Sequence, residues 1–232
     1  MTVHAERLHV ARRHGLSEWT WLTIGLGVGF LVPFVFADLL DVQRDVYYAI
    51  YGIATISLLA AWVRAGEQSP RSFLLHRWRW GVALGIVAAT VLAFAVTLAE
   101  DANSRPDAFR LTGAILWRGV FYGAVDGLLL SVFPILVVYA ALEPHRRRLL
   151  GKAAVGLAAL VASLAFTAVY HLGYSDFRGE KLRKPVTADA IWSAPTLLTA
   201  SPLGAPIAHV GLHVAAVVHS YDTDLFLPPH QG

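Results

Sequence analysis

"LTGAILWRGVFYGAVDGLLLSVFPILVVYAAL", residues Leu111 to Leu142, is an almost unbroken apolar run in the middle of the chain. It is longer than the roughly 20 residues that carry a helix across a bilayer. Two ionisable residues, Arg118 and Asp126, interrupt it. A helix of this length either tilts or breaks, and the break is expected near the glycines Gly119, Gly123 and Gly127.

Five further apolar runs flank this one, and each is long enough to cross or nearly cross a membrane. They are Trp19–Leu40, Val46–Val63, Trp80–Ala99, Ala153–Leu172 and Leu203–Ser220. A shorter segment, "TADAIWSAPTLLTA" from Thr187, fits a re-entrant or interfacial element. The sequence therefore predicts an all-α, polytopic transmembrane helical bundle of about six spans, forming a single integral membrane domain over residues 1–232.

The composition supports a membrane protein whose main partner is the lipid bilayer. Hydrophobic residues make up 56% of the chain and charged residues 15%, whereas soluble domains carry about 25% charged residues. The formal net charge of +3 is attributed to cytoplasmic loops, and no nucleic-acid partner is expected. The chain has no cysteine, which excludes disulfides, thiolate metal sites and cysteine nucleophiles.

The charges between the apolar runs predict an orientation. Basic residues gather at 64–79 and 145–152, and acidic residues gather at 38–45 and 100–107. Positively charged loops stay on the cytoplasmic side. We therefore expect a multi-pass protein of the cell membrane with a cytoplasmic N-terminal tail at residues 1–18.

Two histidines in the last apolar run are candidates for a site. An ionisable group at the centre of a membrane helix costs about 2.5–3.5 kcal/mol, so such groups face a protein interior or a wet cavity. His209 and His213 are four residues apart and share one helix face, where they can hold one metal ion or one water. The alternative, that they are core histidines bonded to backbone carbonyls, stays open at this point.

Helix depth links these histidines to two other runs. His171 closes the fifth run at the face where the sixth begins, and His209 lies about 9 Å inside that face. Asp126 falls at a similar depth if its span starts near Gly119. Asp126 is then a metal ligand, a general base or an orienting partner for a histidine. It is alternatively a turn residue or a partner for Arg118, about 12 Å away along the helix.

Three segments together resemble the CPBP family, the CAAX-prenyl-protease and bacteriocin-processing-like intramembrane proteins. They are "LWRGVFYGAV" (Leu116–Val125), "LAFTAVYHLGY" (Leu164–Tyr174) and "SPLGAPIAHVGLHVAAVV" (Ser201–Val218). Their order and spacing fit the family's motifs, and the resemblance covers residues 111–220.

The resemblance implies an intramembrane protease centre. In that family a glutamate pair and a middle histidine are proposed to activate water, and a final His-x-x-x-Asn stabilises the oxyanion. Arg118 matches the motif arginine, His171 the middle histidine and His209 the last histidine, while His213 stands at the asparagine position. The glutamate positions hold Gly113 and Ala114, which cannot act as bases, so protease activity is doubtful unless Asp126 supplies the carboxylate.

Three functions remain open from the sequence. The chain is a CPBP-like scaffold that has lost its protease centre and binds a lipid, a metal or a partner. Alternatively it is an active hydrolase of a membrane peptide or protein, using a metal-bound or free water. Its catalytic group is then Asp126, His171, His209, His213 and Arg118, with a divalent metal on the three histidines. The third possible function is that of a redox or transport protein with histidine ligands.

Overall fold

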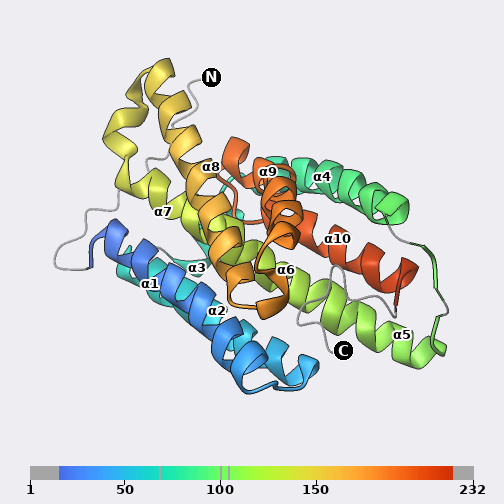
Figure 1. Cartoon of the computed structure of the whole chain (residues 1–232). Coiled ribbons are helices and arrows are strands. Elements are labelled where there is room, and N and C mark those ends of the chain that lie inside the picture. Colours follow the sequence, from blue (N-terminus) through green and yellow to red (C-terminus); the bar gives the residue numbers. More distant parts are fainter. Residues whose placement is uncertain (1–15, 68, 100, 104, 222–232) are drawn as a thin grey trace.

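The computed structural model of the protein describes residues 16–67, 69–99, 101–103 and 105–221. Every regular element in these residues is a helix, which confirms the all-α class (Figure 1). Five helices are long and apolar enough to cross a membrane. They are Glu18–Leu39 (α1, Glu18–Val32, continued by the π-helical η1, Pro33–Leu39), α2 (Arg44–Ala65), α4 (Trp78–Ala99), Ala108–Ala141 and α8 (Leu149–Leu172). The N-terminal tail predicted for residues 1–18 lies almost wholly outside the described residues.

The sixth apolar run forms a shorter helix. α10 (Gly204–His219) has 16 residues and follows α9 (Arg183–Thr199), which has 17. Their connecting turn is buried, and Ala200 within it has a left-handed φ of 57°. The Thr196 hydroxyl accepts the Ala205 N–H and donates to the Ser201 carbonyl, each at 2.9 Å, so the turn's polar backbone is satisfied inside the protein.

Short helices complete the connections between the long ones. α3 (Pro70–Leu75) and η4 (Glu143–Arg147) precede α4 and α8, and η5 (Ser175–Phe177) and η6 (Glu180–Leu182) lie between α8 and α9. The connection between α8 and α9 contacts the end of η1. There Asp38 accepts a hydrogen bond from the Ser175 N–H at 2.8 Å and forms an ion pair with Arg178 at 3.0 Å.

The stretch that decides the fold forms one continuous helix through the middle of the bundle, which we call the central helix. It consists of α5 (Ala108–Ala114), η2 (Ile115–Tyr122), α6 (Gly123–Asp126), η3 (Gly127–Val132) and α7 (Phe133–Ala141). Its most apolar window is 78% buried, against 22–44% for the other four candidate spans. It does not break at its glycines; two π-helical segments, η2 and η3, absorb the irregularity instead.

The three central-helix glycines form the surface on which α10 packs. A Cβ atom on Gly119, Gly123 or Gly127 would lie 2.8 Å from Val214, 3.0 Å from Val210 and 2.5 Å from Pro206, respectively. Small residues at four-residue spacing allow two membrane helices to approach closely. The glycines therefore bring α10, which carries His209 and His213, directly against α6, which carries Asp126.

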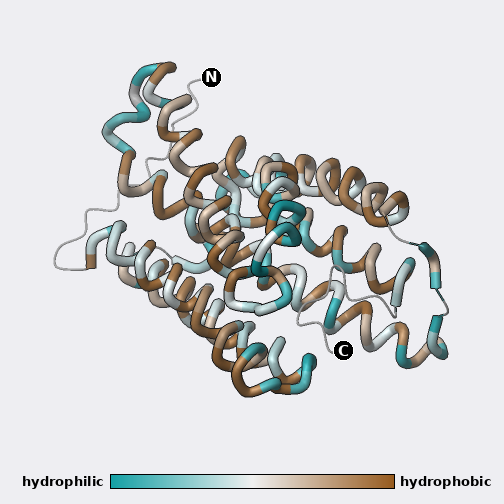
Figure 2. Tube along the Cα trace, viewed as in Figure 1, coloured by the Kyte–Doolittle hydropathy of each residue, from teal (hydrophilic) through white to brown (hydrophobic). Residues whose placement is uncertain are grey.

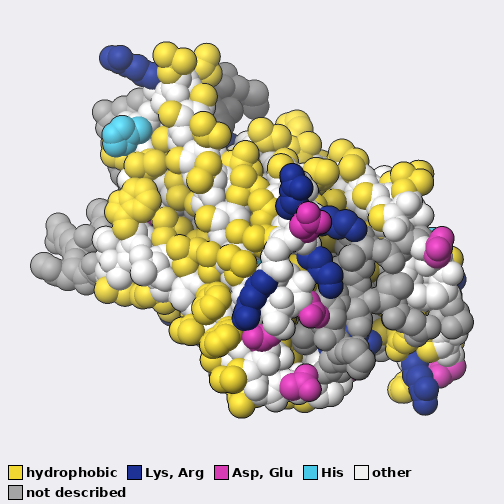
Figure 3. All heavy atoms as spheres, viewed as in Figure 1, with side chains coloured by type: hydrophobic (Ala, Val, Ile, Leu, Met, Phe, Trp, Pro, Cys, Tyr) yellow, Lys and Arg dark blue, Asp and Glu magenta, His cyan; other side chains and the backbone are white. Residues whose placement is uncertain are grey.

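The outer surface of the bundle suits lipid. Large apolar side chains are exposed on α2, α4 and α8, including Ile53, Phe94, Leu98 and Leu157, and the hydrophobic colouring continues along most helices (Figure 2). In the space-filling view the charged side chains gather over the connection between α8 and α9, whereas α7 and α8 present a broad hydrophobic face (Figure 3). The apolar helices thus indicate a lipid bilayer environment.

Candidate metal centre

Asp126 lies at the end of the single α-helical turn between the π-helical segments η2 and η3. Such π-helical irregularities inside α-helices occur frequently at functional sites. The residue is only 4% exposed, and its Oδ1 accepts a hydrogen bond of 2.8 Å from the hydroxyl of Tyr51 on α2. The carboxylate is therefore held in one orientation from a neighbouring helix.

His209 and His213 face Asp126 from α10, one helical turn apart. They are 1% and 3% exposed, and each offers a ring nitrogen within 4.8 Å of the others' ligand atoms and of an Asp126 oxygen. The His213 Nε2 lies 3.4 Å from the Asp126 Oδ2. None of the four ring nitrogens has a hydrogen-bond partner among the described residues. Buried polar atoms without a partner are uncommon, and these four lie together beside a carboxylate, which makes the two imidazoles candidates to bind a ligand.

The donor set fits a zinc-type ion. Zinc binds imidazole nitrogen and carboxylate oxygen at about 2.0–2.2 Å, and its catalytic sites use three protein ligands with one open position. In a tetrahedral site the ligand atoms would be roughly 3.3 Å apart, so the separations of up to 4.8 Å require a small closure of the side chains. Two imidazoles and one carboxylate, with one side open to a pocket, match the catalytic rather than the structural type.

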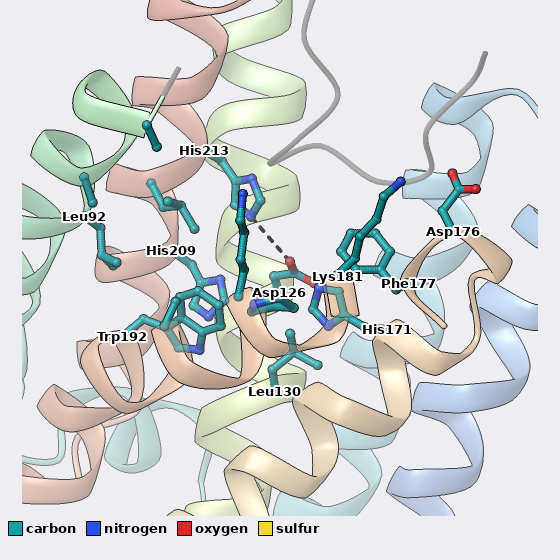
Figure 4. Close-up of a pocket in the computed structure, with 16 residues that line it drawn as sticks. Leu92, Asp126, Leu130, His171, Asp176, Phe177, Lys181, Trp192, His209 and His213 are labelled. Atoms are coloured by element: carbon teal, nitrogen blue, oxygen red, sulfur yellow. Dashed lines mark ion pairs between the residues drawn. The ribbon is translucent and has the colours of Figure 1, made fainter. Parts of the chain in front are cut away.

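A pocket of about 620 Å³ gives access to these three residues, and His171 also lines it. Figure 4 shows His171 beside Asp126, opposite His209 and His213. The His171 Nδ1 lies 2.7 Å from the Thr167 carbonyl oxygen. A carbonyl only accepts, so Nδ1 carries the proton and the basic lone pair is on Nε2. The structure thus brings four of the five candidate residues around one pocket.

Arg118 occupies a different place from the other four candidates. Its guanidinium donates two hydrogen bonds of 3.1 Å to Asp45 at the start of α2, and it is not among the residues that line the pocket. The alternative that Arg118 pairs with Asp126 is therefore not what the structure shows. The expected glutamate positions are also remote, since Gly113 is 13 residues, or about 20 Å of helix, from Asp126.

Sequence reasoning missed a buried tyrosine cluster beside the centre. The Tyr174 hydroxyl lies 2.6 Å from that of Tyr47 and 2.7 Å from that of Tyr170, and the Tyr122 and Tyr170 hydroxyls are 2.7 Å apart. Burial raises the pKa of Tyr174, in the connection after α8, well above its ordinary value, so this phenol stays protonated. A signal was available in the "VYYAIYG" stretch, because a tyrosine in an apolar span needs a partner for its hydroxyl.

A second polar cluster, also missed, lies behind the pocket. The Oδ1 of the fully buried Asp189 lies 3.2 Å from the Ser163 hydroxyl and 3.4 Å from that of Ser131. Three residues on along α9, the Trp192 ring lies against His209 with 4.5 Å between ring centroids. The Trp192 ring therefore packs against the His209 imidazole.

No protein-family model, curated protein or solved structure matches the chain.

Proposed function

We propose that this protein is an intramembrane hydrolase whose centre is a divalent metal ion of the zinc type held by Asp126, His209 and His213. The observation that supports it most is the cluster itself. Three buried ligand groups from two helices lie within 4.8 Å of one another, and the imidazole nitrogens lack hydrogen-bond partners among the described residues. In a membrane helix such groups mark functional sites.

The pocket residues have separate tasks in this proposal. When bound by Asp126, His209 and His213, a zinc-type ion would make a nearby water more acidic and would polarise the substrate carbonyl. Tyr51 orients the Asp126 carboxylate through its 2.8 Å hydrogen bond. His171, whose Nε2 is basic, accepts a proton from the attacking water and returns it to the leaving group. The scissile bond belongs to the ester and amide class.

A second candidate is a metal-free centre, in which the same residues activate a water directly. The 3.4 Å contact between the His213 Nε2 and the Asp126 Oδ2 favours it, because this pair already resembles a carboxylate–imidazole couple. It would correspond to the protease chemistry that the CPBP resemblance implies, with Asp126 replacing the glutamates.

The proposal includes a membrane arrangement. We propose a CPBP-like scaffold in the cell membrane with a cytoplasmic N-terminus, supported by the three motif-like segments and by the basic loops. α10 then forms the sixth passage and α9 the re-entrant segment before it, supported by their lengths of 16 and 17 residues and by the buried turn between them.

Metal content distinguishes the two candidates. Purified protein in neutral detergent, equilibrated with zinc and passed over a desalting column, is expected to retain about one zinc per chain by elemental mass spectrometry. His209→Ala and His213→Ala should each lose most of it, because only two of three ligands remain. The matched control is His219→Ala, which alters a histidine at the end of the same helix.

Two results would decide against the metal. Retention of zinc by both variants places the ion elsewhere. A metal-free wild type that nevertheless hydrolyses an ester or a peptide, with activity lost in Asp126→Asn, supports the second candidate instead.

A further inference from the structure

The pocket above the candidate centre has two chemically different ends. Asp126, His209 and His213 at its floor are buried, whereas Lys181 and Lys184, which also line it, are exposed. The chain contains only three lysines, and two of them are here. A substrate that fills the pocket therefore meets ammonium groups at the rim and the candidate centre at the floor.

The rim carries a net positive charge. Its third charged residue is Asp176, so two cations face one anion. Within the part of the chain that the structure describes, neither lysine makes an ion pair with a carboxylate. Ammonium groups beside an apolar cavity favour an anionic head group on the ligand.

The walls between rim and floor are hydrocarbon. α4 contributes Leu92, Ala95 and Ala99, and the central helix and α10 contribute Leu130 and Leu212. None of these side chains has a hydrogen-bonding group. A peptide backbone along such walls would leave its N–H and C=O groups unsatisfied, at a cost of several kcal/mol per group. An alkyl chain makes no such demand, and 620 Å³ is in the range that holds one ligand of modest size.

We propose that the substrate is a single-chain lipid ester with an acidic head group, phosphate or carboxylate. This inference rests on the proposed function. The head group binds Lys181 and Lys184, the ester carbonyl faces the centre, and the acyl chain turns back from the carbonyl along Leu92 and Leu212. Water adds to this carbonyl and the acyl C–O bond breaks. The products are a fatty acid and the alcohol that carries the head group, with the water proton delivered to that alcohol.

Binding of a non-hydrolysable probe tests the inference without catalysis. Native mass spectrometry of the protein released from neutral detergent should show one bound dodecyl phosphate. Laurate should also bind, and it should need a higher concentration if the site prefers phosphate. Dodecyltrimethylammonium, with the same chain and the opposite charge, should not bind at these concentrations. Lys181→Gln/Lys184→Gln should weaken dodecyl phosphate binding about tenfold or more, since two charge-assisted contacts are removed. Lys181→Arg/Lys184→Arg should retain it.

Controls separate this inference from the proposed function. Lys152→Gln removes the third lysine, which lies at the start of α8, and should bind as the wild type does. His209→Ala/His213→Ala should lose zinc and still bind dodecyl phosphate, so a missing metal does not itself reject the ligand class. Equal binding of the anionic and cationic probes, or unchanged binding by Lys181→Gln/Lys184→Gln, would overturn the inference. Displacement of dodecyl phosphate by a lower concentration of an apolar peptide with a free C-terminus would assign the pocket to peptides instead.

Discussion

Tyr48 and Tyr51 are both fully buried on α2, yet their hydroxyls have different partners. Tyr51 donates to Asp126 at 2.8 Å, whereas the Tyr48 hydroxyl has no hydrogen-bond partner among the described residues and its ring stacks on Tyr122. Groups that orient a metal ligand tune its affinity for the ion. The two tyrosines therefore provide a matched pair in which one hydroxyl acts on the candidate centre and the other does not.

Tyr51→Phe should weaken zinc binding by about 10–100-fold, the usual effect of removing a group that orients a ligand. Tyr48→Phe should leave zinc affinity unchanged. Competition with a chromogenic zinc chelator measures both. Equal affinities in the two variants would show that the Tyr51 hydrogen bond does not position the carboxylate for a metal.

At this scale the sequence predicted part of the site. The i, i+4 spacing of His209 and His213 and the charge of Asp126 were visible, because ionisable residues in apolar runs are rare and informative. The pairing of Arg118 with Asp45, 73 residues away, was not visible, because the choice of partner depends on how α2 packs against the central helix. The tyrosine cluster was missed for the same reason.

The packing of α10 on the central helix depends on glycine at the contact. Gly127→Ala would place a methyl group 2.5 Å from the Pro206 Cα, so the two helices must separate. Overpacking of this kind costs about 1–3 kcal/mol, and the separation would also widen the site. Gly113→Ala, on the same helix, meets nothing within 4 Å and should be neutral or slightly stabilising.

Unfolding midpoints in mixed micelles with increasing sodium dodecyl sulfate measure both glycine variants. A Gly127→Ala variant as stable as Gly113→Ala would mean that α10 does not pack closely on this glycine face.

A second contact links the central helix to α8 and involves a proline and a serine. Pro134 has no N–H, so it cannot supply the i+4 donor that a regular α-helix would give the Leu130 carbonyl. The Ser163 hydroxyl on α8 donates to that carbonyl at 2.9 Å. Ser163→Ala should destabilise the protein by about 0.6 kcal/mol and by no more than about 1.7 kcal/mol, the mean and the maximum measured for hydrogen bonds between membrane helices.

Pro134→Ala in the Ser163→Ala background tests this contact, because it restores the helical N–H. Part of the lost stability should return in the same unfolding assay. The recovery is expected to be incomplete because Ser163 also lies 3.2 Å from Asp189. If no stability returns, Ser163 stabilises the protein through its contact with Asp189 alone.

Most helix positions were predictable because backbone groups in lipid must form their hydrogen bonds within the protein, and a long apolar segment does so as a helix. The predicted runs Trp19–Leu40 and Trp80–Ala99 correspond to helices at Glu18–Leu39 and Trp78–Ala99. The continuity of the central helix was not predictable. From the sequence, its glycines are equally compatible with a helix break and with close helix packing. The contacts with α10 show that they allow close packing.

At the scale of the whole molecule, the charge distribution of the loops supports the proposed orientation. The chain has no cysteine, so single introduced cysteines report their side of the membrane without background. Ser69→Cys and His145→Cys should be shielded from a membrane-impermeant maleimide added to intact cells, and Asp41→Cys and Ala102→Cys should react. The reverse pattern would invert the proposed orientation, and a mixed pattern would change the number of passages.

The central claim is that Asp126, His209 and His213 bind one metal ion inside the membrane domain, and zinc-edge X-ray absorption of the purified protein tests it most directly. The account predicts a first shell of nitrogen and oxygen at about 2.0–2.1 Å, with the outer-shell scattering of two imidazoles. In Asp126→Asn this spectrum should be lost or weakened, whereas Asp41→Asn, an exposed control, should preserve it. A zinc-equilibrated protein without bound zinc, or with zinc whose shell contains no imidazole, would contradict the account.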